Sequence, residues 1–181
     1  MIPCRQGMAE SSNSFIADAS FSKSQDSVKA GQPLTLSLSF KIQGGIREAF
    51  SQKNWERAYN KHDNGFRMTI EVDIKSGRKV IMPLKFVRKA ALFWTRNPKI
   101  EHRIWVSIVK DETPHYPLTV EEAQSQLFDV NKVIELSGSD LDSGSHRLHA
   151  EIRVSWGKHD YTAPTEIRAR SNEVDLMRVA A

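Results

Sequence analysis

The chain has 181 residues, of which 39% are hydrophobic and 27% are charged. These fractions are typical of a soluble globular domain, and the length is sufficient for one domain with a sizeable core. No segment reaches the roughly 20 apolar residues that a membrane-spanning helix needs, which argues against such a protein. The net charge of +4 favours acidic partners without requiring them.

Cysteine usage points to a reducing compartment. Cys4 is the only cysteine, so no intrachain disulfide can form. The sequence contains no Asn-x-Ser/Thr acceptor for glycosylation, and residues 1–14 lack the apolar segment of a secretory signal. We therefore expect a cytoplasmic protein, although a secreted chain whose signal had been removed would look the same.

Three segments alternate apolar and polar residues without a break, which is typical of half-buried antiparallel strands. They are residues 34–42, 66–74 and 148–156. Further strands are expected at residues 15–21, 80–86, 104–108, 128–136 and 166–179. The apolar face changes phase within the last two of these strands. We therefore predict a register change near Asn131 and a bulge near Ser171–Asn172.

Residues 76–77 begin a hairpin between the strands at 66–74 and 80–86. A strict two-residue loop would place Lys79 and Lys85 on the core face. The hydrophobic pattern instead predicts a three-residue loop or a bulge, so that Ile74 faces Val80.

Other features of the chain concern its edges and ends. Pro83 falls on the outward face of its strand and indicates an edge strand. Residues 46–62 are rich in helix formers without one apolar stripe, which predicts two short turns or a helix buried on both sides. A capping-box match at residues 119–122 predicts a short helix from about Val120 to Leu127. Residues 1–13 are expected to be a flexible tail, and residues 14–181 a single domain.

The segment from Leu141 to Ile152 resembles a known architecture. It carries Gly144 in a turn, His146 shortly after it, and then the alternating residues of a strand. This pattern resembles the E-to-F corner of immunoglobulin-like and fibronectin-like domains, with His146 in the place usually given to tyrosine. We therefore expect an all-β fold, an immunoglobulin-like antiparallel β-sandwich of seven to eight strands with one or two short helical insertions. Such a fold carries no implied activity.

No catalytic, cofactor or metal motif stands out, so we expect neither an enzyme nor a cofactor. His146 and His149 lie three residues apart in a strand, and their side chains therefore point to opposite faces. Asp140, Asp142 and Glu151 resemble part of a calcium loop, but the glycine is misplaced and a third oxygen ligand is missing. The polar turn is the simpler interpretation.

The charge distribution is the one uneven feature. Residues 75–103 contain nine basic residues and one acid, whereas residues 110–142 contain eight acids and two lysines. Three interpretations are open: the two segments neutralise each other across the surface, the basic segment binds phosphate backbones, or it docks a protein or an anionic membrane surface. The candidate binding residues are Lys85, Arg88, Lys89, Phe93, Trp94, Arg96 and Lys99. The cations would contact phosphates and one of the two aromatic rings would stack on a base.

The leading hypothesis is a non-catalytic interaction or scaffolding module that binds a protein partner through loops or a basic edge. The alternative is a nucleic-acid-binding protein that uses the basic and aromatic residues 75–103. An enzyme with a site assembled from scattered polar residues is the third possibility.

Overall fold

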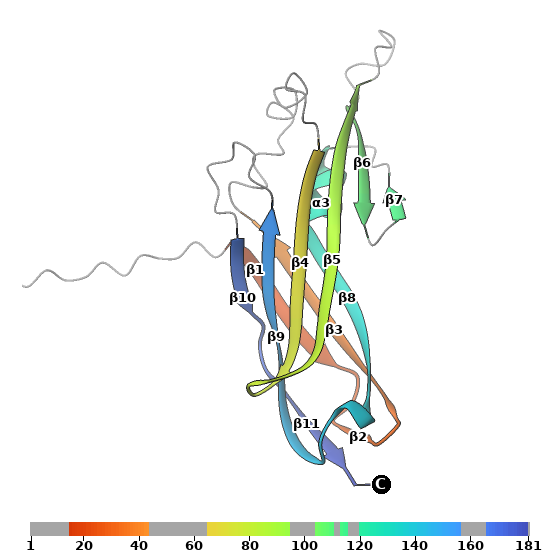
Figure 1. Cartoon of the computed structure of the whole chain (residues 1–181), viewed down its shortest axis with the longest axis vertical. Helices are drawn as coiled ribbons and strands as arrows, with labels where there is room; N and C mark the ends of the chain where they lie inside the picture. The colour runs from red at the N-terminus through yellow and green to blue at the C-terminus, as the bar shows by residue number, and fades with distance from the viewer. Residues whose placement is uncertain are drawn as a thin grey trace, which may run out of the picture.

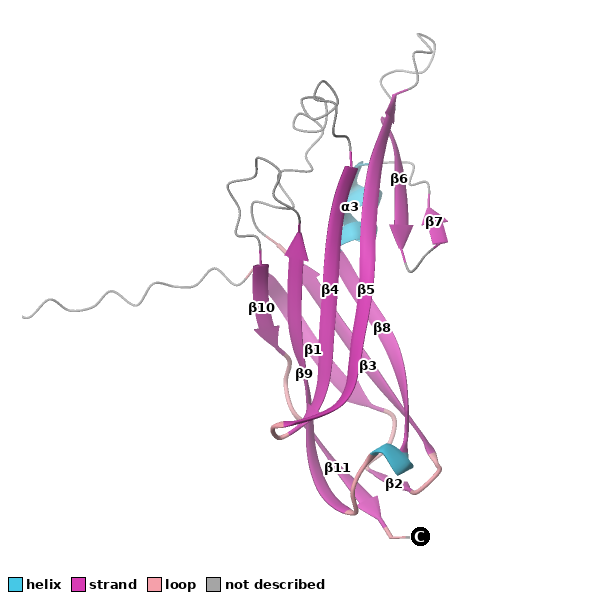
Figure 2. Cartoon of the chain, in the orientation of Figure 1, coloured by secondary structure: helices cyan, strands magenta, loops and turns pink. Residues whose placement is uncertain are grey.

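The computed structural model describes residues 15–43, 65–94, 104–110, 113–115, 120–156 and 166–180. The predictions for the tail at 1–13 and for the segment 46–62 lie outside these residues. The all-β prediction is confirmed, because the described chain is mostly strand and forms two sheets (Figures 1 and 2).

The strands in chain order are β1 (Ile16–Lys23), β2 (Ser27–Lys29), β3 (Pro33–Ile42), β4 (Gly65–Ser76), β5 (Lys79–Trp94), β6 (Ile104–Lys110), β7 (Thr113–His115), β8 (Asp129–Ser137), β9 (Gly144–Trp156), β10 (Glu166–Arg170) and β11 (Val174–Val179). The predicted helix is confirmed as α3 (Val120–Phe128), and a short 3-10 turn, η1 (Gly138–Asp140), follows β8. The short strands β2 and β7 were not expected from the sequence.

The two sheets differ greatly in width. The small sheet has three strands in the order β1-β3-β8. The large sheet has eight, in the order β2-β11-β9-β4-β5-β6-β7 with β10 also on β9, and it curls into a half-barrel. Strands pair antiparallel throughout except β2 with β11. The chain reaches both sheets at its start, since β1 belongs to the small sheet and β2 to the large one.

The core lies between the sheets and follows the period of two in the sequence. Even-numbered residues of β3, β4 and β9 face inward, as an alternating pattern requires. Thirteen of them are at most 2% exposed: Leu34, Leu36, Leu38, Phe40, Ile42, Met68, Ile70, Val72, Ile74, Leu148, Ala150, Ile152 and Val154. These three strands are the ones that the sequence predicted most clearly.

Strand β8 keeps one register with β3 along its whole length, so the predicted register change near Asn131 is wrong. The prediction was wrong because Lys132 lies on the core side of the strand, in phase with apolar residues. Its ammonium group lies 4.9 Å from the centre of the Phe86 ring, a cation–π contact that allows a lysine in this phase. Val133 is consequently directed to solvent and is 69% exposed.

The hairpin between β4 and β5 contains the predicted bulge. Gly77 has a positive φ of 57° in the turn, and the register shifts between Ile74 and Lys75. Ile74 faces Met82 and not the predicted Val80. The bulge keeps the apolar faces of β4 and β5 inward, and the turn is shorter than the predicted three-residue loop. The first half of β5 pairs only with β4 among the described strands, as Pro83 indicated for an edge strand.

The predicted bulge near Ser171–Asn172 is also confirmed. Strands β10 and β11 both pair with β9, and three residues between them face two residues of β9. The side-chain amide of Asn172 leaves this bulge and bonds the backbone of Phe21 in β1. Its Oδ1 accepts from the Phe21 amide at 2.7 Å, and its Nδ2 donates to the Phe21 carbonyl at 2.8 Å. One side chain thus joins the two sheets at this margin.

Arg88 joins the sheets at the opposite margin. It follows Met82, Leu84 and Phe86 on the inward face of β5 and is fully buried. Its Nη1 donates to the carbonyl oxygens of Leu127 and Asp129, at 2.8 Å each. These carbonyls lie where α3 ends and β8 begins, so the bonds fasten the large sheet to the small one.

Replacing Arg88 with methionine removes the donor to both carbonyls while keeping a long side chain. Since an unsatisfied buried acceptor costs about 1–3 kcal/mol, we expect Arg88→Met to lower the free energy of unfolding by about 3 kcal/mol. Lys85, on the same strand but directed outward, is the matched control, and Lys85→Met should cost less than about 1 kcal/mol. Urea unfolding measures both values. Equal losses would contradict the structural role of Arg88.

Candidate functional site

A charged groove crosses the outward face of β4, β9 and β10 in the large sheet. Its volume is about 300 Å³. Six charged side chains line it: Glu71, Asp73, Glu151, Arg153, Arg168 and Arg170. They occupy alternate positions of three neighbouring strands, because the intervening residues of β4 and β9 are buried in the core.

The first cross-strand row of the groove is a network of ion pairs centred on Glu71. Strand register places Glu71 between Lys85 and Arg153. The Nη2 atom of Arg153 lies 2.5 Å from Glu71 Oε2, and Lys85 Nζ lies 3.2 Å from Oε1. The hydrogen bonds from Lys85 and then Arg153 hold the pKa of the Glu71 carboxyl below its usual range.

The second row places two carboxylates opposite each other, Asp73 on β4 and Glu151 on β9. Glu151 is compensated by Lys75, whose Nζ lies 2.5 Å from Oε2. The hydrogen bond from Lys75 lowers the pKa of Glu151. Asp73 has no hydrogen bond or ion pair with any other described residue. Among the described residues, Asp73 is therefore the one carboxylate of the groove without a counter-charge beside it.

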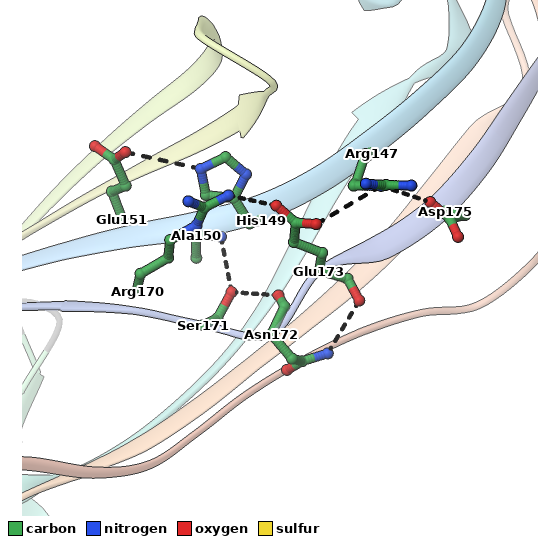
Figure 3. Close-up of polar contacts among 9 residues, drawn as sticks. All are labelled: Arg147, His149, Ala150, Glu151, Arg170, Ser171, Asn172, Glu173 and Asp175. Carbon is green, nitrogen blue, oxygen red and sulfur yellow. Dashed lines mark hydrogen bonds and ion pairs between the residues drawn. The ribbon is translucent and has the colours of Figure 1, made fainter.

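The bulge between β10 and β11 borders the groove, because Arg170 lines the groove and directly precedes the bulge. Figure 3 shows the polar contacts of the bulge. Ser171 exchanges two bonds with Ala150: its backbone amide donates to the Ala150 carbonyl, and its Oγ accepts from the Ala150 amide, both at 2.9 Å. Arg170, the last residue of β10, forms an ion pair with Glu173 of the bulge. The bulge thus has a fixed geometry and closes one end of the charged surface.

His149 lies beside this bulge and is only 2% exposed. Its Nε2 lies 3.7 Å from Glu151 Oε1, and Figure 3 draws this contact as a dashed line. The buried Nδ1 atom finds no hydrogen-bond partner among the described residues. On the other face of β9, His146 Nε2 lies 2.7 Å from the Asp142 carbonyl and Nδ1 lies 2.9 Å from Ser76 Oγ. A carbonyl only accepts, so Nε2 carries a proton there.

The arrangement favours ionic recognition over proton transfer. A general acid needs a carboxyl whose pKa is raised, whereas those of Glu71 and Glu151 are lowered. Within the described ranges, no group of three histidine, cysteine or acidic side chains is placed to hold a metal ion. Arg168 and Arg170 form ion pairs with Glu166 and Glu173, so among the described residues only Asp73 of the six groove charges lacks an ion pair. These exposed ion pairs can exchange for complementary charges on another molecule.

The residues predicted to bind along the basic stretch have different positions. Lys85 is exposed and pairs with Glu71. Arg88 is buried, which leaves its guanidinium no contact with phosphate at the surface. Lys89, Phe93 and Trp94 lie in β5, with their side chains outside the described part. Arg96 and Lys99 lie outside the described residues altogether.

The described ion pairs support only in part the interpretation that the basic segment 75–103 and the acidic segment 110–142 neutralise each other. Lys75 pairs with Glu151, Lys79 with Asp142, and Lys85 with Glu71. Only Asp142 of these acids belongs to the acidic segment 110–142, since the others come from neighbouring strands of the same sheet.

The groove was not predicted from the sequence. Charges at every second position of three strands were visible, as Glu71 and Asp73, Glu151 and Arg153, and Arg168 and Arg170. That they meet depends on the order β10-β9-β4, which brings together segments about 80 residues apart.

Comparison of the chain with protein-family models, curated proteins and solved structures finds no match. In the part of the chain that the structure describes, no helix has the length and apolar character needed to cross a membrane.

The contact between Lys75 and Glu151 can be tested by titration. We expect Lys75→Met to raise the pKa of Glu151 toward its ordinary value of 4.5, because the hydrogen bond that most lowers it is lost. Lys79→Met is the matched control, since Lys79 pairs with Asp142. Carbon-detected NMR of the carboxyl groups measures each pKa. If the pKa of Glu151 is the same in Lys75→Met as in the wild-type chain, the contact between Lys75 and Glu151 is excluded.

The lowered pKa values of Glu71 and Glu151 determine in which direction pH changes the stability of the fold. A carboxyl whose pKa is lower in the folded chain stabilises the fold above its unfolded pKa, and this contribution disappears as the pH falls through the folded pKa. For Glu71 and Glu151 the loss begins below about pH 4.5. Lys75→Met should weaken the pH dependence there, and Lys79→Met should leave the Glu151 contribution in place.

Proposed function

We propose that this protein is a non-catalytic interaction module that binds a protein partner through the charged groove on its large sheet. The observation that carries the proposal is the meeting of Arg153, Arg168 and Arg170 with three carboxylates on one outward face. Arginine is enriched at protein interfaces and pairs with carboxylates through two parallel hydrogen bonds. The partner would present a basic group near Asp73, and carboxylates that replace Glu166 and Glu173 beside Arg168 and Arg170.

The fold is further proposed to be immunoglobulin-like. The small sheet has the order expected of strands A, B and E, and β11-β9-β4-β5 has the order expected of G, F, C and C′. The bond from His146 to the Asp142 carbonyl, four residues upstream, corresponds to the backbone bond of a tyrosine corner. The curled large sheet and the absence of a fourth strand from the small sheet, among the described residues, are departures from that pattern.

Nucleic-acid binding through residues 75–103 stays an alternative. Its support now rests on Lys89, Arg96 and Lys99 with the aromatic residues near them, since Lys85 is ion-paired and Arg88 is buried. A mobility-shift assay with single-stranded DNA and RNA tests it. The alternative requires retention at low salt that falls steeply as salt is added, and it requires Lys89→Glu to weaken the complex. Absence of retention would exclude it.

For the protein-binding proposal, charge reversal at Arg168 should abolish capture of the partner. We expect the wild-type chain to retain a protein from a native extract that Arg168→Glu loses, with the dissociation constant of the purified partner rising at least tenfold. Lys41→Glu is the control, because it makes the same charge change on the outward face of the small sheet. It should bind within about twofold of wild type. Equal losses in both variants would indicate a non-specific charge effect and contradict the proposal.

A further inference from the structure

The free edges of the two sheets differ in how they are protected from pairing with another chain. Strand β1 is interrupted by a register shift between Ala17 and Ser20, and Asn172 occupies the amide and carbonyl of Phe21. Strands β2 and β7 have three residues each. The first half of β5 carries Pro83, outward lysines and the bulge beside Ile81. Short length, proline, charge and bulges are the devices by which proteins block edge pairing.

Strand β8 lacks most of these devices along its middle. Backbone groups are occupied at its two ends, where the Asp129 carbonyl accepts from Arg88 and the Ser137 amide donates to the Asp140 carboxylate, so pairing would use the backbone between them. It has nine residues without proline, and its register with β3 is continuous from Asp129 to Ser137. Among the described strands, β3 is its only partner. Val133 lies at its centre and, at 69% exposure, is the most exposed large hydrophobic residue in the described part. Lys132, the charge on its inner side, has its ammonium group over the Phe86 ring.

We propose that β8 pairs antiparallel with β8 of a second copy of this chain, about a two-fold axis at Val133. The two small sheets would then form one continuous sheet of six strands. In this register Val133 faces Val133 of the second copy, Asn131 faces Glu135, and Asp129 faces Ser137. No pair of like charges is opposed, and the Asn131 amide can donate to the Glu135 carboxylate.

The neighbouring registers of the β8 pair are less favourable. An axis at Lys132 opposes two lysines and also brings Asp129 against Glu135. An axis at Glu135 opposes two glutamates. An axis at Ile134 sets each Val133 against a Glu135 carboxylate. Like charges directly opposite each other destabilise an antiparallel pair, so the charges of β8 select the axis at Val133.

Light scattering after size exclusion tests the association. We expect the wild-type chain to have twice its chain mass of 20.6 kDa. Val133→Lys and Val133→Glu should each be monomeric, because each opposes two like charges. An equimolar mixture of the two variants should recover the dimer. Met177→Lys makes the same change at another exposed hydrophobic position, 44% exposed and on β11, and should remain dimeric.

Cysteine cross-linking tests the register in a Cys4→Ser background. Val133→Cys should form an intermolecular disulfide, because facing residues have Cβ atoms about 5 Å apart. Glu135→Cys should not, because its two copies would lie about four residues apart along the strands, roughly 13 Å.

Three results would overturn the proposal. They are a wild-type chain that stays monomeric up to about 100 µM, a Val133→Lys variant that remains dimeric, and cross-linking at Glu135→Cys in preference to Val133→Cys. The charged groove plays no part in this contact. Arg168→Glu should therefore leave the dimer intact, which separates this result from the test of partner binding.

Discussion

The small sheet is too narrow to cover the large one, and this mismatch shapes the rest of the structure. Three strands face eight, so the margins of the sandwich cannot be closed by backbone pairing alone. Two polar side chains close them. Asn172 bonds the backbone of Phe21 on one side, and Arg88 bonds the carbonyls of Leu127 and Asp129 on the other. The apolar core between the sheets stabilises the fold by burial, and these bonds fix how one sheet lies on the other.

The same margins separate the surfaces available to other molecules. The bulge that projects Asn172 toward β1 also fixes one end of the charged groove, because Arg170 and Glu173 belong to it or border it. At the opposite margin Arg88 ties β5 to the start of β8 and leaves the rest of β8 without a second strand among the described residues. The groove is suited to ionic recognition, and the edge of β8 to backbone pairing.

Period-two alternation was sufficient to predict β3, β4 and β9, because each buries one face completely. It failed where a charged residue takes a core position. Lys132 and Arg88 both lie in phase with apolar neighbours, and both looked like surface residues in the sequence. Their partners, the Phe86 ring and two backbone carbonyls, are about 40 residues away in the chain and form no local pattern. The groove was missed for a related reason, since the order of strands decides which outward charges meet.

Native-state hydrogen exchange on Asn172→Ala is the most direct test of the idea that side chains close the margins. We expect faster exchange of the Phe21 amide and its neighbours in β1, while the central amides of β4 and β9 keep their protection. A uniform change at all amides would mean that Asn172 contributes only to global stability. An unchanged exchange rate of the Phe21 amide would contradict this role of Asn172, because the amide would then be protected without the Asn172 side chain.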